Sequence, residues 1–180
     1  MSQELPLFLK FKMEIERKFL IKEKTKKYPC PYNLKELKKE IKLYGVNIIQ
    51  HYLPEKLSKE IFGILGFQIN FIPHDLRIRK YGNDFFITLK SKGSIKRKEF
   101  ERKISKGEFK ILEKLKIKTV KKIRLIKNFQ RKKIEFDYYK KHSLIIAEIE
   151  FNSLFEAKNF KTNMKEITGI GKYGNRNLAD

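Results

Sequence analysis

Charged side chains recur at every second position in several separate stretches of this chain. The run Glu14-Ile15-Glu16-Arg17-Lys18 shows the pattern, which returns at 75–79, 97–101, 122–124, 135–137 and 148–150, with a less polar version at 86–90. Successive side chains of a strand point to opposite faces, so this spacing places the charges on one face of each strand. An ordinary half-buried strand hides its apolar face and exposes its polar one. So many strands with a charged face predict a closed sheet with a polar interior, whose apolar outer face is covered by helices.

The charges on the predicted inner faces have both signs. The basic members are Lys18, Arg77, Arg79, Lys90, Arg97, Lys122 and Arg124. The acidic members are Glu14, Glu16, Asp75, Glu99, Glu101, Glu135, Asp137, Glu148 and Glu150. Burying such charges costs several kcal/mol per ion unless they are paired or ligated. Carboxylates at positions i and i+2 can share a hard divalent cation, and a lysine two residues further can reach a phosphate bound to that cation. The pattern therefore predicts a tunnel that holds cations on an acidic wall and a polyanion, such as a triphosphate, on a basic wall.

A series of motifs in this order resembles one known family. The run from Glu14 to Leu20 resembles the ExExK signature of the CYTH superfamily, also called triphosphate tunnel metalloenzymes. The resemblance continues to the end of the chain through Gln50–Leu53, Leu76–Arg79, Phe86–Gly93, Arg97–Glu101, Ala147–Phe151 and Lys172–Ala179. It implies an α+β fold, in which an eight-stranded antiparallel β-barrel forms a tunnel with a charged interior and is flanked by helices. Residues 1–180 are then a single domain.

The resemblance also implies the cofactor and the site residues. The cofactor is Mg²⁺ or Mn²⁺, with the metal ligands Glu14, Glu16, Asp137, Glu148 and Glu150. Phosphate oxygens are bound by Lys18, Arg77, Arg79, Lys90, Arg97, Lys122 and Arg124. In small bacterial tripolyphosphatases of the family, a lysine and a tyrosine contribute to catalysis. Lys18 and Tyr52 match these two positions and are the predicted catalytic residues.

By the same resemblance, we expect an enzyme that hydrolyses a linear triphosphate, by attack of water on a terminal phosphoryl group. Inorganic tripolyphosphate is the preferred substrate, because nothing in the sequence clearly recognises a base, a ribose or a thiazolium ring, and the chain has no Trp. A nucleoside triphosphatase and a class IV-type adenylyl cyclase are the alternatives, and a thiamine triphosphatase is less favoured. A non-catalytic module that binds polyphosphate or RNA is a further hypothesis. Pure anion binding, however, would gain nothing from Glu14, Glu16, Glu148 and Glu150.

Composition bounds the partners and the compartment. The formal net charge is +22, from 43 Lys and Arg against 21 Asp and Glu, and it favours polyanionic ligands. Many lysines lie outside the charged strands, so we interpret them as solvated surface and expect no nucleic acid partner. Cys30 is the only cysteine, which excludes an internal disulfide and suits a reducing cytoplasm. No stretch is long and apolar enough to span a membrane. The histidines lack metal-ligand spacing and are interpreted as structural: His51, His74 and His142.

The remaining expectations concern the order of elements. Helices are predicted at 34–43, 54–65, 106–115 and 154–164, and a loop at 22–32. Strands are predicted at 13–21, 47–53, 67–72, 75–80, 85–90, 96–104, 117–126, 132–139 and 143–151. We interpret residues 1–12 as an extension that folding does not need, and the lysine-rich helix 34–43 as decoration of the fold. Members of the family are often dimers, so the resemblance leaves a homodimer open.

Overall fold

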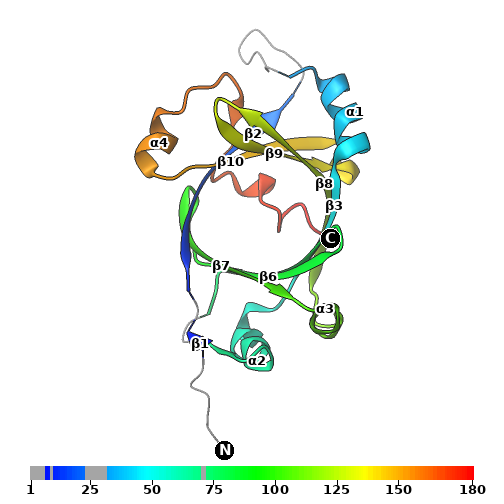
Figure 1. The fold of residues 1–180 in the computed structure, drawn as a ribbon, viewed down its shortest axis with the longest axis vertical. Helices are drawn as coiled ribbons and strands as arrows, with labels where there is room; N and C mark the ends of the chain where they lie inside the picture. Colours follow the sequence, from blue (N-terminus) through cyan, green and yellow to red (C-terminus); the bar gives the residue numbers. More distant parts are fainter. Residues whose placement is uncertain (1–6, 9, 23–31, 70–71) are drawn as a thin grey trace, which may run out of the picture.

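Eight strands of this chain form one closed antiparallel barrel (Figure 1). The computed structural model describes residues 7–8, 10–22, 32–69 and 72–180. The strand order is β10-β9-β8-β3-β5-β6-β7-β2, and the pairing of β10 with β2 closes the ring. The strands are β2 (Lys12–Ile21), β3 (Val46–Tyr52), β5 (Asp75–Tyr81), β6 (Asp84–Lys90), β7 (Lys96–Ile104), β8 (Lys118–Phe129), β9 (Lys132–Tyr139) and β10 (Leu144–Glu150). The predicted eight-stranded α+β barrel is confirmed.

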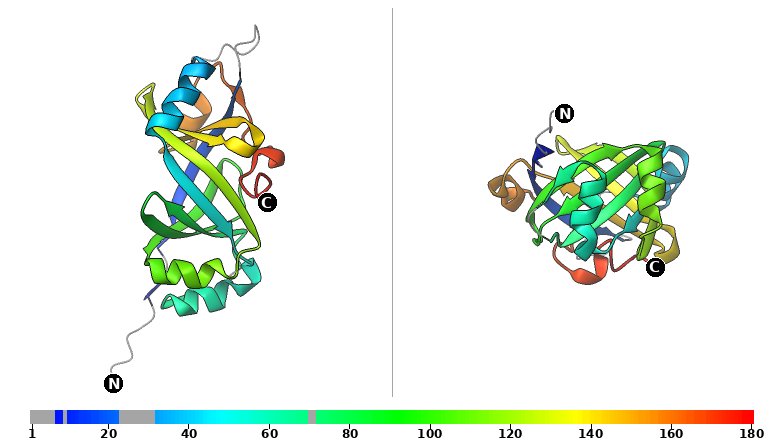
Figure 2. Two further views of the ribbon diagram at one scale, coloured as in Figure 1. Left: turned by 90° about the vertical axis from the view of Figure 1, so that its right-hand side faces the viewer. Right: turned by 90° about the horizontal axis from the view of Figure 1, so that it is seen from below.

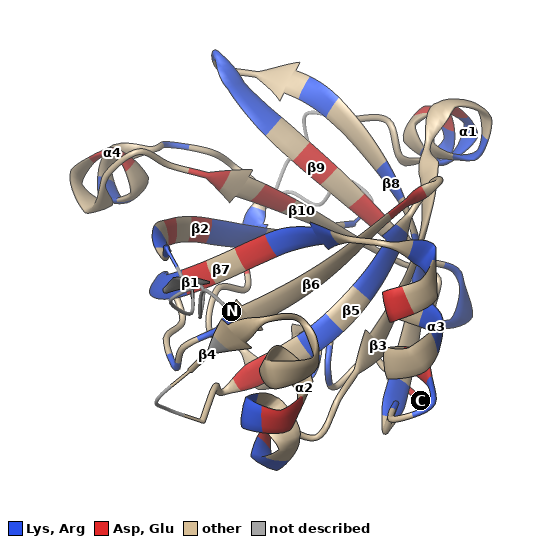
Figure 3. Cartoon of the chain, turned by 60° about the horizontal axis from the view of Figure 1, so that its bottom comes forward, with Lys and Arg blue, Asp and Glu red and all other residues tan. Residues whose placement is uncertain are grey.

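The register of the barrel brings charges of opposite sign together on its inner surface. Lys18 of β2 lies opposite Glu148 of β10, and Glu14 of β2 lies opposite Arg97 of β7. Figure 3 shows charged and other residues alternating along β5, β7 and β9. The alternate position Ile15 belongs instead to an apolar cluster outside the ring. The period of two in the sequence is therefore the alternation between the inside and the outside of the barrel.

Among the described residues, four α-helices cover the apolar outer face (Figure 1). Two of them, α1 (Leu34–Tyr44) and α4 (Leu154–Asn159), pack with β2, β9 and β10 in one apolar cluster. The other two, α2 (Ser58–Ile64) and α3 (Lys106–Glu113), share a second cluster with β5, β6 and β7. A short 3₁₀ turn, η1 (Glu55–Leu57), precedes α2. The helices thus bury the apolar outer face of the barrel, whose inner face is charged.

Capping side chains set where two of these helices begin. Asn33 precedes α1, and its side chain accepts hydrogen bonds from the backbone N–H groups of Lys35 and Glu36. Ser105 precedes α3 and forms a reciprocal capping box with Glu108. Each side chain satisfies backbone donors that a helix leaves unpaired in its first turn.

The C-terminal segment crosses one end of the barrel (Figures 1 and 2). It follows β11 (Lys165–Glu166) and contains the 3₁₀ turn η3 (Gly171–Tyr173). Leu178 packs with Tyr52 and Tyr139 in a third apolar cluster, and the backbone of Asp180 exchanges two hydrogen bonds with Thr119. The segment therefore closes this end of the interior.

Three predicted elements differ from the structure. Of the strand predicted at 67–72, the described residues form only β4 (Phe67–Gln68), which pairs in parallel with β1 (Leu7–Phe8), and residues 70–71 lie outside the described part. The helix predicted over 54–65 begins as η1. The helix predicted to reach Met164 ends at Asn159, where Arg17 Nη1 donates hydrogen bonds to the carbonyl oxygens of Ala157 and Phe160 at 2.7 and 2.9 Å.

Some expectations lie outside the described residues. Cys30, most of the loop predicted at 22–32 and most of the extension 1–12 are among them. At the end of that extension, Lys12 begins β2 and the ring of Phe11 lies 6.2 Å from that of Phe100. Whether folding needs residues 1–12 stays a prediction. In the described part of the chain, no helix combines the length and apolarity needed to cross a membrane.

Candidate active site

The barrel encloses a cavity of about 210 Å³. Its basic lining residues are Lys12, Lys18, Arg77, Arg79, Lys90, Arg97, Lys122, Arg124 and Lys133. The other lining residues are Glu14, Glu16, Glu99, Glu101, Glu135, Glu148, Glu150, Gln50 and Asn175. All of the predicted phosphate-binding residues, and every predicted metal ligand except Asp137, therefore meet at this cavity. Their roles stay predictions.

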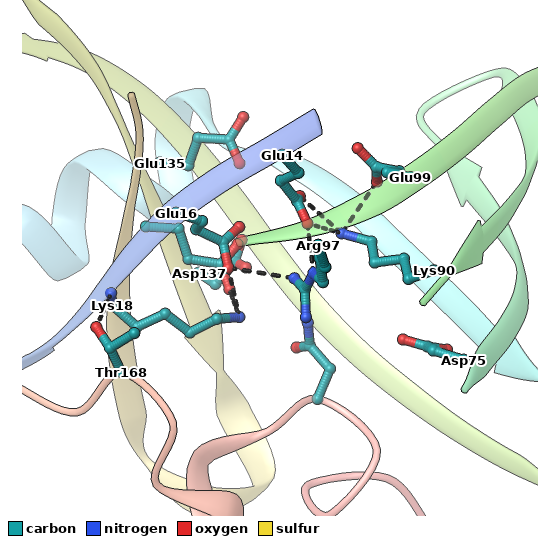
Figure 4. A network of polar contacts seen from close by, with 12 residues as sticks. Glu14, Glu16, Lys18, Asp75, Lys90, Arg97, Glu99, Glu135, Asp137 and Thr168 are labelled. Atoms are coloured by element: carbon teal, nitrogen blue, oxygen red, sulfur yellow. Dashed lines mark hydrogen bonds and ion pairs between the residues drawn. The ribbon is translucent and has the colours of Figure 1, made fainter. Parts of the chain in front are cut away.

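One cluster of ion pairs joins β2, β6 and β7 (Figure 4). Lys90 Nζ lies 2.7 and 2.9 Å from the two carboxylate oxygens of Glu14, and 2.9 Å from Glu99 Oε1. Arg97 Nε donates to Glu14 Oε2 at 2.5 Å. Burial disfavours the charged form of Glu14, but Lys90 and Arg97 outweigh it and lower the pKa of Glu14 to about 2. Glu14 is therefore ionised at neutral pH.

A second cluster joins β2, β8, β9 and β10. Asp137 is fully buried and accepts hydrogen bonds from Lys122 Nζ at 2.5 Å and from Arg124 at 2.6 Å through each of its oxygens. Arg124 Nη2 also donates to Glu148 at 2.9 Å, and Glu148 in turn lies 2.5 Å from Lys18 Nζ. Asp137 does not line the cavity but supports the basic residues that do. Its contacts are those of an internal counter-ion to Lys122 and Arg124.

The pKa values of two lysines at the cavity move in opposite directions. Burial lowers the pKa of Lys18, but the carboxylates of Glu148 and Glu16 outweigh burial and raise it above the ordinary value. Burial also lowers the pKa of Lys122, and the charge of Arg124 helps to bring it to about 8, against the opposing effect of Asp137. Lys18 is thus held protonated while these carboxylates surround it, which suits contact with an anion better than removal of a proton from water.

Two pairs of carboxylates face each other across neighbouring strands. Glu16 lies opposite Glu150, and Glu148 lies opposite Glu135. Burial raises the pKa of Glu135, Arg124 opposes this rise and Glu148 adds to it. Like charges directly opposite each other destabilise a sheet, so these pairs suit a shared divalent cation.

The donor atoms at these pairs fit the predicted cofactor. Carboxylate oxygens are the ligands that Mg²⁺ and Mn²⁺ prefer. Over residues 10–22, 32–69 and 72–180, however, no three acidic, His or Cys side chains converge as ligands to one ion. The carboxylates hold Lys and Arg instead, so a metal would have to compete with these ion pairs.

Arg77 and Arg79 offer donors for an anion. Arg77 Nη1 lies 3.5 Å from Asp75, and Arg79 Nη2 lies 2.9 and 3.0 Å from the carboxylate oxygens of Glu101. The Nε atoms of both arginines are buried and have no hydrogen-bond partner. Buried donors without a partner are costly, so this part of the wall suits a ligand that accepts hydrogen bonds.

Tyr52 lies deeper than its predicted role requires. Its side chain is 1% exposed, and its hydroxyl accepts a hydrogen bond from Gln50 Nε2 at 2.7 Å. Gln50 lines the cavity, and Tyr52 does not. Burial raises the pKa of Tyr52, and the nearby charge of Asp75 adds to this rise, so the hydroxyl keeps its proton. The catalytic assignment of Lys18 and Tyr52 stays a prediction.

The sequence did not place four of the lining residues on the inner wall: Lys12, Lys133, Gln50 and Asn175. Lys12 and Lys133 continue the alternation two positions before Glu14 and Glu135, so the same period would have found them. Asn175 lies in an irregular segment, where only the C-terminal motif indicated it. Its amide oxygen accepts hydrogen bonds from Tyr139 Oη and, at 3.4 Å, from Lys122 Nζ.

Comparison with known proteins adds to this geometry. No protein-family model matches the chain. No curated protein sequence matches it either. Among solved structures, the inorganic triphosphatase NE1496 is 26% identical, with a TM-score of 0.52 over 92% of this chain and 96% of that one.

Two other solved structures share the fold at lower identity. A Bacillus halodurans protein that carries an unproven assignment as an adenylate cyclase is 18% identical, with a TM-score of 0.53 over 82% of this chain and 85% of that one. The PH1012 protein of Pyrococcus horikoshii is 21% identical, with a TM-score of 0.50 over 81% of this chain and 83% of that one. The closed eight-stranded barrel and the triphosphatase neighbour are consistent with the CYTH superfamily of triphosphate tunnel metalloenzymes, the family that the sequence motifs resemble.

Proposed function

We propose that this chain is a metal-dependent triphosphatase whose substrate is inorganic tripolyphosphate. One observation supports this substrate above the others: the described residues that line the tunnel cavity are all charged, apart from the amides Gln50 and Asn175. An aromatic or aliphatic platform for a base is absent from that lining. Nucleotide sites combine apolar walls with a few polar groups, whereas a bare phosphate chain needs only charges and hydrogen-bond donors.

The balance of charge in the cavity suits a triphosphate with a divalent cation. The basic lining residues outnumber the acidic ones. The basic side chains could pair with the phosphate oxygens, and the carboxylates could pair with the cation. Glu14, Glu16, Glu148 and Glu150 would hold Mg²⁺ or Mn²⁺, which would act as a Lewis acid and neutralise charge on the phosphoryl oxygens. Asp137 would support this site from behind the lining, through its contacts with Lys122 and Arg124. Side chains of the protein would carry out the other parts of the proposed mechanism.

Positioning and electrostatics carry most of the proposed catalysis. Arg77 and Arg79 bind phosphoryl oxygens through donors that have no protein partner. Protonated Lys18 neutralises charge that develops on an oxygen during phosphoryl transfer, and Tyr52 acts from behind the lining, by holding Gln50 through their hydrogen bond. Lys90, Arg97, Lys122 and Arg124 complete the basic wall.

The test of substrate choice is a comparison of initial rates and products with tripolyphosphate and with ATP, each in the presence of Mg²⁺. The proposal expects orthophosphate and pyrophosphate from tripolyphosphate, at a rate well above any turnover of ATP. Faster release of orthophosphate from ATP would identify a nucleoside triphosphatase instead. Formation of cyclic AMP and pyrophosphate would identify an adenylyl cyclase. The cytoplasmic location and the homodimer stay predictions.

A further inference from the structure

A second and larger cavity lies on the outer surface of the barrel. It has a volume of about 1040 Å³, and none of its lining residues lines the tunnel. Outward-facing residues of β3 and β8 contribute to it, with α3 on one side and η2 (Lys140–His142) with the C-terminal residues on another. Figures 1 and 3 show α3 and the C-terminus on the same side of the molecule. We call this cavity the lysine groove, after its residues Lys80, Lys106, Lys110, Lys116, Lys121, Lys140 and Lys141.

The lysine groove has an unbalanced positive charge. The acidic side chains of its lining are Glu113 and Asp180, which pair with Lys116 and Lys141. The other lysines form no ion pair with any residue in the described part of the chain: Lys80, Lys106, Lys110, Lys121 and Lys140. These lysines come from β5, α3, β8 and η2, so the fold gathers them from separate segments. A concave surface lined by one sign of charge concentrates ligands of the opposite sign.

Between the lysines, the lining is apolar and partly aromatic, with Phe85 half-buried at its surface and Phe109 and His51 buried beneath. The ring of Phe109 lies 4.9 Å from that of Phe85 and 5.8 Å from that of His51. His51 is fixed from both sides, by Thr119 Oγ1 at 2.8 Å from Nδ1 and by Glu113 Oε1 at 3.2 Å from Nε2. A simple inorganic anion would gain nothing from such a floor. A ligand that joins a regular series of negative charges to flat apolar groups would use both parts of the groove.

We propose that the lysine groove binds single-stranded nucleic acid. Proteins that bind single-stranded nucleic acid combine a basic groove that follows the phosphates with aromatic side chains beside the bases. A second copy of this chain is disfavoured as the occupant, because each copy carries a formal charge of +22. The concave shape is unsuited to a flat membrane surface. This proposal is independent of the reaction in the tunnel.

Fluorescence anisotropy with a labelled oligouridylate of about 16 nucleotides tests the proposal on the full chain. Saturating tripolyphosphate is present, so that the tunnel cannot account for the signal. The groove variant is Lys110→Gln with Lys121→Gln and Lys140→Gln. The matched control removes the same charge from α1 on another part of the barrel, through Lys35→Gln, Lys39→Gln and Lys42→Gln.

The groove variant should bind the oligonucleotide roughly tenfold more weakly than the control variant does, and the slope of log affinity against log salt should fall by about 2. Release of orthophosphate from tripolyphosphate should be the same in both variants. Equal loss of affinity in the two variants would mean that general surface charge is responsible, and would overturn the proposal. Absence of oligonucleotide binding in the presence of tripolyphosphate, or tighter binding of long-chain polyphosphate or polyglutamate to the groove, would also overturn it.

Discussion

Among single residues, burial and neighbouring charges together set the protonation state of each lysine in the tunnel. Lys18 and Lys122 both face the cavity, yet Glu148 and Glu16 raise the pKa of Lys18, while burial and Arg124 lower that of Lys122 to about 8. A shared residue type and a shared face therefore do not imply a shared role. Sequence spacing placed both lysines on the inner wall, but it could not rank their pKa values.

Replacement of Lys18 tests its proposed place in catalysis. Lys18→Ala should lower kcat by about two orders of magnitude, because it removes charge stabilisation of the transition state, and should change KM much less. Steady-state release of orthophosphate from tripolyphosphate measures both constants. Lys22→Ala, an exposed lysine just beyond the same strand, is the control. An unchanged kcat in Lys18→Ala would remove this lysine from the mechanism.

The pKa of Glu14 predicts how stability depends on acid. Its folded-state pKa is about 2 against an ordinary value of 4.5, so the unfolded chain takes up the proton first as the pH falls. The stability that Glu14 contributes is present above pH 4.5 and is lost between 4.5 and about 2. Wild-type protein should therefore lose up to about 3 kcal/mol more than Glu14→Gln over this range.

Urea unfolding at several pH values measures this difference. The control for the loss of one charge is Glu60→Gln, which changes an exposed residue of α2. Equal loss of unfolding free energy in wild type and Glu14→Gln would show that the ion pairs of Glu14 with Lys90 and Arg97 contribute nothing.

At the scale of elements, the two faces of β2 have separate tasks. Glu14, Glu16 and Lys18 line the tunnel, while Arg17 points outward and forms two hydrogen bonds with Glu166 at 2.9 and 2.7 Å. The guanidinium group also holds carbonyl oxygens at the end of α4. Strict alternation thus predicts that neighbouring residues of one strand affect different properties.

Arg17→Ala should lower the free energy of unfolding by about 2 kcal/mol, because charged hydrogen bonds to β11 and α4 are lost. It should leave kcat for tripolyphosphate nearly unchanged. Chemical denaturation and steady-state kinetics measure the two effects, and Arg17→Lys, which keeps the charge without the paired geometry, should recover only part of the stability. A fall in kcat as large as that of Lys18→Ala would contradict this division of tasks.

At the scale of the whole molecule, the sequence reveals the faces of the strands but not the depth of each residue along the tunnel. The alternation identified the basic wall and the two Glu pairs at Glu14–Glu16 and Glu148–Glu150. It could not show that Asp137 and Tyr52 lie behind the lining, because the stagger of the barrel sets depth. The lysine groove was not predictable for a related reason, since its lysines converge from separate elements without any spacing rule.

We expect this tunnel to bind and hydrolyse a triphosphate together with a divalent metal. The most direct test is release of orthophosphate from tripolyphosphate with Mg²⁺, with Mn²⁺ and with EDTA, using wild type and Glu148→Gln with Glu150→Gln. A variant that loses two exposed carboxylates, Glu36→Gln with Glu60→Gln, is the matched control. Wild type and the control should release orthophosphate when either metal is present, and release should be lost in EDTA and in the tunnel variant. Turnover in EDTA would show that hydrolysis needs no metal, and full Mg²⁺-dependent turnover by the tunnel variant would show that Glu148 and Glu150 do not hold the metal.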